Sequence, residues 1–505
     1  MTRFIAAAFY HGFWHVSCCQ RTPMLASSAM EEPVVVVSRP GIRYALDAPF
    51  DPPNPVYEMV EAALRGLGLD AARAGTPEWN PLGDLIAPGD RVLIKPNFVT
   101  SKNFEEQLRG EKLACSSTHG SVLRPILDYA LRAAGPRGRV TVVDTPVEGC
   151  NLEDVVAGLG VRALLEWYAA RGRRVDFIDF RYFKVVPRML LDDVRRFGRS
   201  LNLGLLLRER LPGDPLGYSV VDVGERSYFE EVAERAPRFC FHRSHQATPR
   251  PHHARGRHQY SIPRTLLDAD VVINIPKLKT HKKSGVTLAL KSCIGLTNEK
   301  YWLPHYTAGV PHEGGDEFPF PPPWSVRAEN QLQRFPLPLD NSFIARAPKR
   351  SDGRSQNGFL HGYIMEGSWE GNDTIWRTVL DLNRVLFYAD RNGRMSDRPQ
   401  RRYLALVDGL IAGEGEGPLA STPRAAGLLI GGRDPVLVDV AAARAMGYAE
   451  AHIPMIARAL AAAGQPLLPT SDVAALRIVR DGPAPTGTFK PPKTWLSLLR
   501  PAPAV

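Results

Sequence analysis

The segment from Leu267 to Lys300 carries the densest set of side chains that could perform acid–base chemistry. Lys277, Lys279 and His281 stand at alternate positions directly after an apolar run. Ammonium groups spaced in this way can hold a carboxylate or a phosphate, and nearby positive charge favours a neutral imidazole that can accept a proton. We therefore expect Lys279 and His281 to be catalytic and Lys277 to bind substrate; a solvated basic loop is the alternative.

Lys291 lies in the same segment, at the end of the stretch that follows Gly285. Its ammonium group could polarise a developing oxyanion or anchor a cofactor, which makes it the third expected catalytic residue. Cys293 lies close by and could be a thiol activated by positive charge, although a small buried hydrophobic residue is the commoner role.

Three carboxylates, Asp408, Glu414 and Glu416, follow another apolar run and are spaced by glycines that would let the backbone approach a ligand. Such a set could bind a divalent metal such as Mg²⁺ or take part in general acid–base catalysis. Exposed acids in a glycine-rich loop are the alternative. The run contains neither a P-loop nor a G-x-G-x-x-G motif, so it does not indicate a nucleotide.

Four further polar residues, Lys95, Asn97, His119 and Asp144, fall at the expected ends of strands or at the start of a helix. Anions bind at helix N-termini, and side chains converge where parallel strands end. We expect all four to bind substrate.

A second basic window runs from Pro237 to Arg264, with six arginines, five of the 13 histidines and no acid. The histidines could bind a metal, but their spacing is irregular and better fits a loop that contacts anions. As a nucleic-acid surface the window would need aromatic platforms, and it offers only Phe239, Phe241 and Tyr260.

The elements that must position these groups alternate between strands and helices. Short runs rich in Val, Ile and Phe, typical of strands buried on both faces, alternate with amphipathic stretches typical of helices. The expected strands lie at 31–40, 91–99, 139–146, 173–180, 217–224, 269–277 and 402–413, and the expected helices at 54–69, 121–135, 376–389 and 434–448. This order predicts an α/β fold with mostly parallel sheets and helices on both faces.

The chain of 505 residues is long enough for several domains. We expect a disordered extension or misassigned start at 1–29, a first α/β region at 30–230, a second at 231–475, and a Pro-rich tail at 476–505. A Pro- and Gly-rich insertion at 301–371 interrupts the second region and could form a lid.

Composition narrows the class of protein. Hydrophobic residues make up 44% and charged residues 23%, which excludes disorder for most of the chain, and no apolar run is long enough to span a membrane. The net charge of +10 favours an anionic partner. The six cysteines contain no C-x-x-C pair, so we expect a reducing, cytoplasmic location and no iron–sulfur cluster.

Five stretches together resemble the domain of unknown function 362 family of bacteria and archaea. They are VLIKPN, STHGSVLRPILDYAL, VVDTPVEGCNLE, ADVVINIPKLKTHKKSGVTLALKSCIG and LVDGLIAGEGEGP, and the resemblance runs from about residue 34 to 465. Some members are joined to ferredoxin-like iron–sulfur modules, whose cysteine pattern this chain lacks. The resemblance implies no particular reaction.

The order Ala269-Asp270, an apolar strand, His281, Gly285 and Lys291 is also faintly similar to the nickel-pincer lactate racemase family. That similarity implies that His281 is a metal ligand or base and that Lys291 anchors the cofactor. The family's glycine-rich run before the lysine is here VTLAL, which puts the cofactor in doubt.

We expect an enzyme that acts on a small anionic substrate by Lys- and His-assisted proton transfer, of the isomerase, racemase or oxidoreductase type. A divalent metal or another cofactor is left open, as are the substrate and the oligomeric state. The alternative is a non-enzymatic protein that binds a polyanion, either nucleic acid or acidic glycan, through its two basic windows. The carboxylates and the spread of charge favour the enzyme, so we do not expect nucleic acid or a membrane as partner.

Overall fold

The structure of the protein is a computed structural model. It describes residues 33–44, 55–102, 107–189, 204–242, 248–322, 366–461, 467–468 and 472–500. The expected extension at 1–29 and most of the expected insertion, at 323–365, lie outside these ranges.

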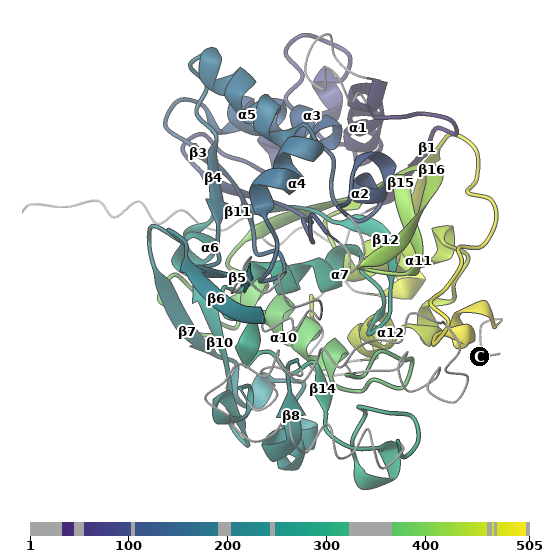
Figure 1. Ribbon diagram of the computed structural model, residues 1–505. Coiled ribbons are helices and arrows are strands. Elements are labelled where there is room, and N and C mark those ends of the chain that lie inside the picture. Colours follow the sequence, from purple (N-terminus) through teal and green to yellow (C-terminus); the bar gives the residue numbers. More distant parts are fainter. Residues whose placement is uncertain are drawn as a thin grey trace, which may run out of the picture. The chain divides into compact units, whose positions relative to one another are not determined.

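A mixed sheet, formed by ten strands of the described residues, is the centre of the fold (Figure 1). The order is β17 (Ile478–Asp481), β1 (Val34–Ser38), β16 (Ala420–Gly432), β15 (Arg402–Glu416), β11 (Val271–Ile275), β2 (Arg91–Pro96), β3 (Arg139–Asp144) and β4 (Asp176–Asp179), with β12 (Lys277–His281) between β15 and β13 (Gly285–Val286). The run from β15 to β4 is parallel, whereas β16 is antiparallel to both of its neighbours.

Both faces of the sheet are buried, as the continuous apolar strands predict. In β1, Val34 and Val36 face one core while Val35 and Val37 face the other, because side chains alternate along a strand. One face is covered by α1 (Pro55–Gly66), α3 (Gly120–Ala134), α4 (Leu152–Gly158) and α5 (Val161–Ala170), and the other by α7 (Leu288–Ser292), α10 (Ile375–Tyr388), α11 (Pro435–Ala445) and α12 (Pro454–Leu460) (Figure 1). The α/β fold with helices on both faces is confirmed.

Smaller elements complete the described chain. Two of them are the short helices α2 (Gly110–Ala114) and α6 (Arg264–Asp268). The others form three small antiparallel sheets: β7 (Tyr218–Asp222) with β10 (Arg257–Pro263) and β9 (His253–Ala254); β8 (Phe239–Cys240) with β14 (Tyr306–Thr307); and β5 (Phe183–Met189) with β6 (Gly204–Arg210). Within these residues, no helix is long and apolar enough to cross a membrane.

Two segments expected to be loops are strands instead. The basic run after Ile275 continues as β12, parallel to β15, with Lys277 opposite Asp408. The glycine-rich run up to Glu416 belongs to β15, whose hairpin with the unforeseen strand β16 supplies its hydrogen bonds. Glycine is usually depleted in strands, so the pairing partner decides this conformation rather than local preference.

The two expected α/β regions share this sheet. Strand β1, from the first, is hydrogen-bonded to β16, from the second. The expected tail also enters the fold, because β17 pairs with β1 and Trp495 is 1% exposed.

Candidate active site

Most of the charged residues singled out in the sequence meet where β2, β3 and β11 end. Lys95 lies near the end of β2, Asp144 ends β3, and β12 takes the chain onward from β11 with Lys277 and Lys279. In parallel sheets this edge is where ligands bind. All four side chains are fully buried, which is rare for charged groups unless they are paired or bind a ligand.

Some of the lysines have a carboxylate partner. Nζ of Lys95 lies 2.9 Å from Oδ1 of Asp144 and also donates to the carbonyl oxygen of Pro96. Nζ of Lys283 lies 3.5 Å from Oε2 of Glu366. Lys277 is paired as well, with Asp408. These pairs neutralise the buried charge at three points around the site.

Three other lysines have no carboxylate partner among the described residues; we call Lys279, Lys291 and Lys300 the lysine cluster. Nζ of Lys279 donates to Oδ1 of Asn97 at 2.8 Å and to the carbonyl of Ser116. Within the described part of the chain, Nζ of Lys300 donates to two backbone carbonyls, those of Thr145 and Pro146. No described residue forms a hydrogen bond or an ion pair with Nζ of Lys291. The cluster therefore leaves positive charge available to a ligand.

Among the three lysines of the cluster, Lys291 has a pKa that is lowered to near neutral pH. Burial, together with the charges of Lys300, Lys283 and Lys95, lowers its pKa to about 7, and Asp144 only partly opposes this effect. Burial also lowers the pKa of Lys279 well below its usual value, and the charge of Lys291 adds to the shift. Lys291 therefore exchanges a proton near neutral pH.

The short helix α7, which carries Lys291, is held at three points. The carboxylate of Asp439 accepts from the N–H groups at the start of the helix, of Ala289 at 2.7 Å and of Leu290 at 3.0 Å. Asn274 and Asn383 donate side-chain N–H groups to carbonyls of the helix, at 3.0 and 2.9 Å. Buried partners of this kind fix the backbone from which Lys291 projects. Sequence reasoning missed all three.

His281 is neutral, as expected, but its proton is in the wrong place for a base. Burial lowers its pKa well below the usual value, and the charges of Lys291 and Lys279 add to this. Its Nδ1 accepts from the backbone N–H of Lys283 at 3.0 Å, so the ring proton must sit on Nε2. His281 can donate a hydrogen bond to a ligand, but Nε2 lacks the free lone pair needed by a base or metal ligand. The nickel-ligand role therefore does not fit.

His305 has the opposite arrangement and was missed. Its Nδ1 donates to the carbonyl of Leu303 at 3.0 Å, which leaves a lone pair on Nε2. Burial and the charges of Lys283 and Lys291 lower its pKa well below the usual value, so the ring is neutral. It lies in the expected insertion, where no motif marked it.

His119, expected to bind substrate, instead caps a helix. Its Nδ1 accepts from the backbone N–H of Ser121 at 3.1 Å, in the first turn of α3. Its ring stacks on Tyr44 with centroids 4.2 Å apart, and burial lowers its pKa to about 3.

The three carboxylates expected to hold a metal have separate cationic partners. Asp408 pairs with Lys277 at 3.0 Å, Glu414 with Arg424 at 3.1 Å, and Glu416 with Lys282 at 3.0 Å. The described residues contain no group of three or more His, Cys, Asp or Glu that could hold a metal. The expected metal site is therefore not formed by this set.

Two of the five histidines in the window from Pro237 to Arg264 lie inside the protein. His253 and His258 are buried, with their Nδ1 atoms 3.3 Å apart, and Nε2 of His258 contacts Glu230 at 3.1 Å. Phe239 and Tyr260 have no exposed surface, so they cannot stack on bases. Cys293 is also buried, which raises its pKa to about 12 and makes it a poor nucleophile at neutral pH.

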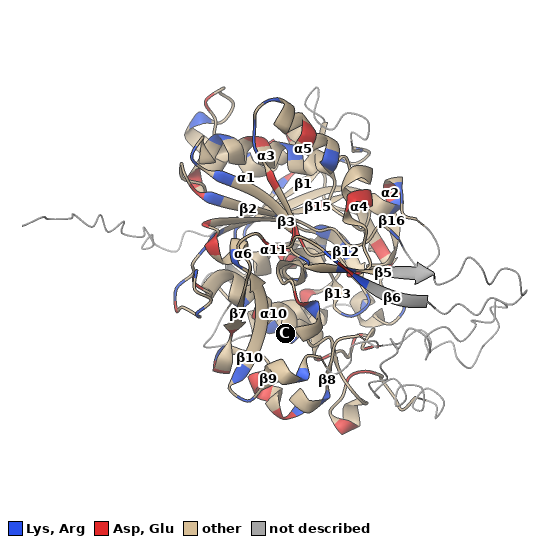
Figure 2. Cartoon of the chain, turned by 60° about the vertical axis from the view of Figure 1, so that its left-hand side comes forward, with Lys and Arg blue, Asp and Glu red and all other residues tan. Residues whose placement is uncertain are grey.

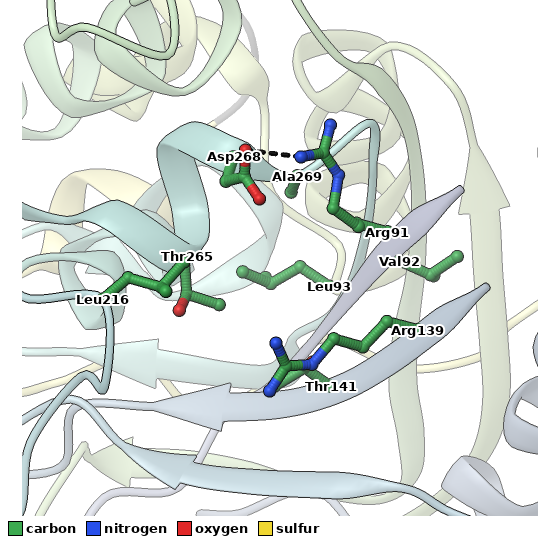
Figure 3. A pocket seen from close by; sticks show the side chains of 9 residues that line it. All are labelled: Arg91, Val92, Leu93, Arg139, Thr141, Leu216, Thr265, Asp268 and Ala269. Atoms are coloured by element: carbon green, nitrogen blue, oxygen red, sulfur yellow. Dashed lines mark hydrogen bonds and ion pairs between the residues drawn. The ribbon is translucent and has the colours of Figure 1, made fainter. Parts of the chain in front are cut away.

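A small cavity of about 30 Å³ lies at the opposite ends of the strands (Figure 3). Arg91 and Arg139, the first residues of β2 and β3, line it, and Arg91 pairs with Asp268 at 2.5 Å. Since Asp268 and Asp270 already neutralise Arg91, and the cavity is small for an organic ligand, it is a poor substrate site.

Comparison with known proteins gives one family. The model of a domain of unknown function, DUF362, matches residues 213–444, a range that includes β11, β12, α7 and β15. No curated protein and no solved structure matches the chain.

Proposed function

Because residues 213–444 place this chain in the domain of unknown function 362 family, which implies no reaction, we propose a function from the side chains alone. The protein is an enzyme that binds a small anionic substrate at the lysine cluster and moves protons with Lys291 and His305. The observation that carries this proposal is the presence of three largely buried lysines without a carboxylate partner among the described residues.

The electrostatic argument concerns the cost of burying charge. An ammonium group taken out of water without an opposite charge costs several kcal/mol. The nearby carboxylates of Asp144, Asp408 and Glu366 form ion pairs with other lysines, and the charge of Glu148 only partly offsets the burial of Lys300. A substrate with one or two negative charges would offset the cost at the lysine cluster.

The hydrogen bonds and pKa shifts of the site indicate which side chains can accept a proton and which can donate one. Lys291, with its pKa of about 7, can take up and release a proton at neutral pH, which suits a general acid or base. His305 offers a lone pair at Nε2, and His281 offers an N–H. A neutral imidazole that donates a hydrogen bond can stabilise negative charge developing on a substrate oxygen.

The binding of a large polyanion is less consistent with this arrangement. Lys277 and Lys279 are inside the protein, where a nucleic acid or glycan chain could not reach them. Figure 2 shows positive and negative residues interspersed over the visible elements rather than separated into a basic face.

The proposal is tested by binding of simple anions at constant ionic strength. Inorganic phosphate, malonate and citrate are titrated by calorimetry into the wild type and into Lys279→Met, Lys291→Met and Lys112→Met, the last an exposed lysine in α2. At least one of these anions should bind to the wild type. Its affinity should fall about tenfold or more in Lys279→Met and Lys291→Met, a loss of about 1.4 kcal/mol in binding free energy, and should be unchanged in Lys112→Met. Equal binding to all four proteins, or no binding beyond that of chloride, would show that the site has another purpose.

A further inference from the structure

We infer that Lys291 is a nucleophile that forms an imine with a carbonyl group of the substrate. The substrates are then small carbonyl compounds that also carry a carboxylate or phosphate, held through that group by Lys279 and Lys300. This inference rests on the proposed function and adds to it the class of substrate and a covalent step.

The first argument is the state of the amine. A lysine that only neutralises charge normally donates hydrogen bonds, as Lys95 and Lys277 do in this site. Nζ of Lys291 has no such partner among the described residues although its side chain is largely buried. When the amine is neutral, its electron pair is not engaged by the protein and is free to attack a carbon atom.

The second argument is the charge around it. Lys300, Lys283 and Lys95 all act on Lys291 and disfavour its protonated form. Neighbouring cations are an established way to make a lysine nucleophilic, because they hold a substantial fraction of it as the free amine at neutral pH. Of these three, Lys300 has no carboxylate partner among the described residues, so it can also attract the anionic end of a substrate.

The third argument is the rigidity of the backbone that carries the amine. Leu288, the first residue of α7, has a φ of 49°, a conformation that costs about 1 kcal/mol or more for a residue with a side chain. The hydrogen bonds from the next two residues to Asp439 hold it there. Such precision matters more for covalent attack, which requires a defined approach to the carbonyl carbon, than for attraction of an anion.

The step balances without any further reactant. Nζ of Lys291 attacks the carbonyl carbon, the C=O bond breaks, and a C=N bond replaces it. The nitrogen loses its two protons and the oxygen leaves with both of them as water. Nε2 of His305 can take a proton from the nitrogen and return it to the leaving oxygen, while the N–H of His281 can hydrogen-bond to that oxygen.

The experiment traps the imine by reduction. Full-length protein is incubated with pyruvate, glyoxylate or 2-oxoglutarate, treated with sodium borohydride, and analysed by intact and peptide mass spectrometry. Hydride addition to the C=N bond leaves a stable secondary amine. The same treatment is applied to Lys291→Arg, which keeps a positive charge, and to Lys112→Arg as the exposed control.

We expect one stoichiometric adduct on Lys291 in the wild type and in Lys112→Arg, and none in Lys291→Arg. The rate of trapping should rise through pH 7 and level off above pH 8, whereas ordinary lysines become more reactive up to about pH 10.

Two other results are distinguishable. If phosphate, malonate or citrate binds but no probe leaves an adduct on Lys291, the imine is wrong while the anion site stands. If none of these anions binds, the proposed function itself fails. Adducts spread equally over Lys291 and surface lysines would also overturn the inference, because Lys291 would then have no special reactivity.

Discussion

Lys277 in β12 and Asp408 in β15 form an ion pair across two neighbouring parallel strands, with Nζ and Oδ2 3.0 Å apart and neither side chain exposed. The hydroxyl of Tyr44 completes the contact, because it donates to Oδ1 of Asp408 at 2.5 Å and accepts from Nζ of Lys277 at 2.7 Å. The backbone N–H of His119 donates to the same carboxylate. The pair thus ties β12 and β15 to the start of α3.

Replacing Asp408 by Asn should destabilise the protein by about 3–5 kcal/mol, because it leaves Lys277 buried without a counter-charge. The double variant Lys277→Met/Asp408→Leu, which removes both charges, should recover most of that loss. The free energy of unfolding in urea measures both changes. A double variant as unstable as Asp408→Asn would show that packing or the hydrogen bonds of Tyr44, rather than the unpaired charge, account for the effect.

Replacing Lys291 by Met should stabilise the protein at pH 7. The folded-state pKa of about 7 lies below the usual 10.5, so the unfolded chain binds more protons between these values and wild-type stability rises with pH in this window. The advantage of the variant should be a few kcal/mol at pH 7 and should shrink by about 1.4 kcal/mol per pH unit toward pH 10. Lys112→Met, at an exposed position, should show no such trend. A constant difference across this range would contradict the assignment.

Replacing Gly295 by Ala should disrupt the edge of the site. An added methyl group would overlap Oδ1 of Asp144 and come within 2.8 Å of Nζ of Lys95, so one member of this ion pair must move. We expect a loss of about 3 kcal/mol in the free energy of unfolding and weaker anion binding. Gly149→Ala is the control, since its methyl group would meet only a carbonyl oxygen at 3.8 Å. Equal stability of the two variants would mean that the pair is not needed.

Replacing His119 by Asn should make the protein less sensitive to acid. The folded-state pKa of about 3 is below the usual 6.5, so the unfolded chain gains a proton between these values and stability falls as the pH drops below 6.5. Asn also caps helices well, so α3 should keep its start. The slope of unfolding free energy between pH 4 and 6 should decrease by about 1.4 kcal/mol per pH unit. His312→Asn, an exposed position, should leave it unchanged.

Much of the fold and part of the site could be predicted from local sequence. The apolar runs before Lys95, Asp144 and Lys277 indicated parallel strands, and the rule that such strands end at a common edge brought these residues together correctly. Lys279 joined them, although in a strand rather than in a loop.

The parts of the site that could not be predicted depend on contacts between residues that are distant in the sequence. Asp439 and Asn383 hold α7 but lie far along the chain, and no spacing connects them with Lys291. Glu414 pairs with Arg424 on the neighbouring strand β16, and the glycines of this segment had indicated a loop rather than a hairpin. Glu416 pairs with Lys282, which is distant in the sequence. A role for His305 becomes visible only when the hydrogen bond of each ring nitrogen is known.

Trp495, near the end of the described chain, supports a turn that lies more than 200 residues earlier in the sequence. Its ring packs against Gly285, and its Nε1 donates to the carbonyl of Lys282 at 2.5 Å, so it supports the turn between β12 and β13. Residue 495 is synthesised after every strand of the central sheet. The turn between β12 and β13 therefore lacks this support until almost the whole of the described chain has been synthesised.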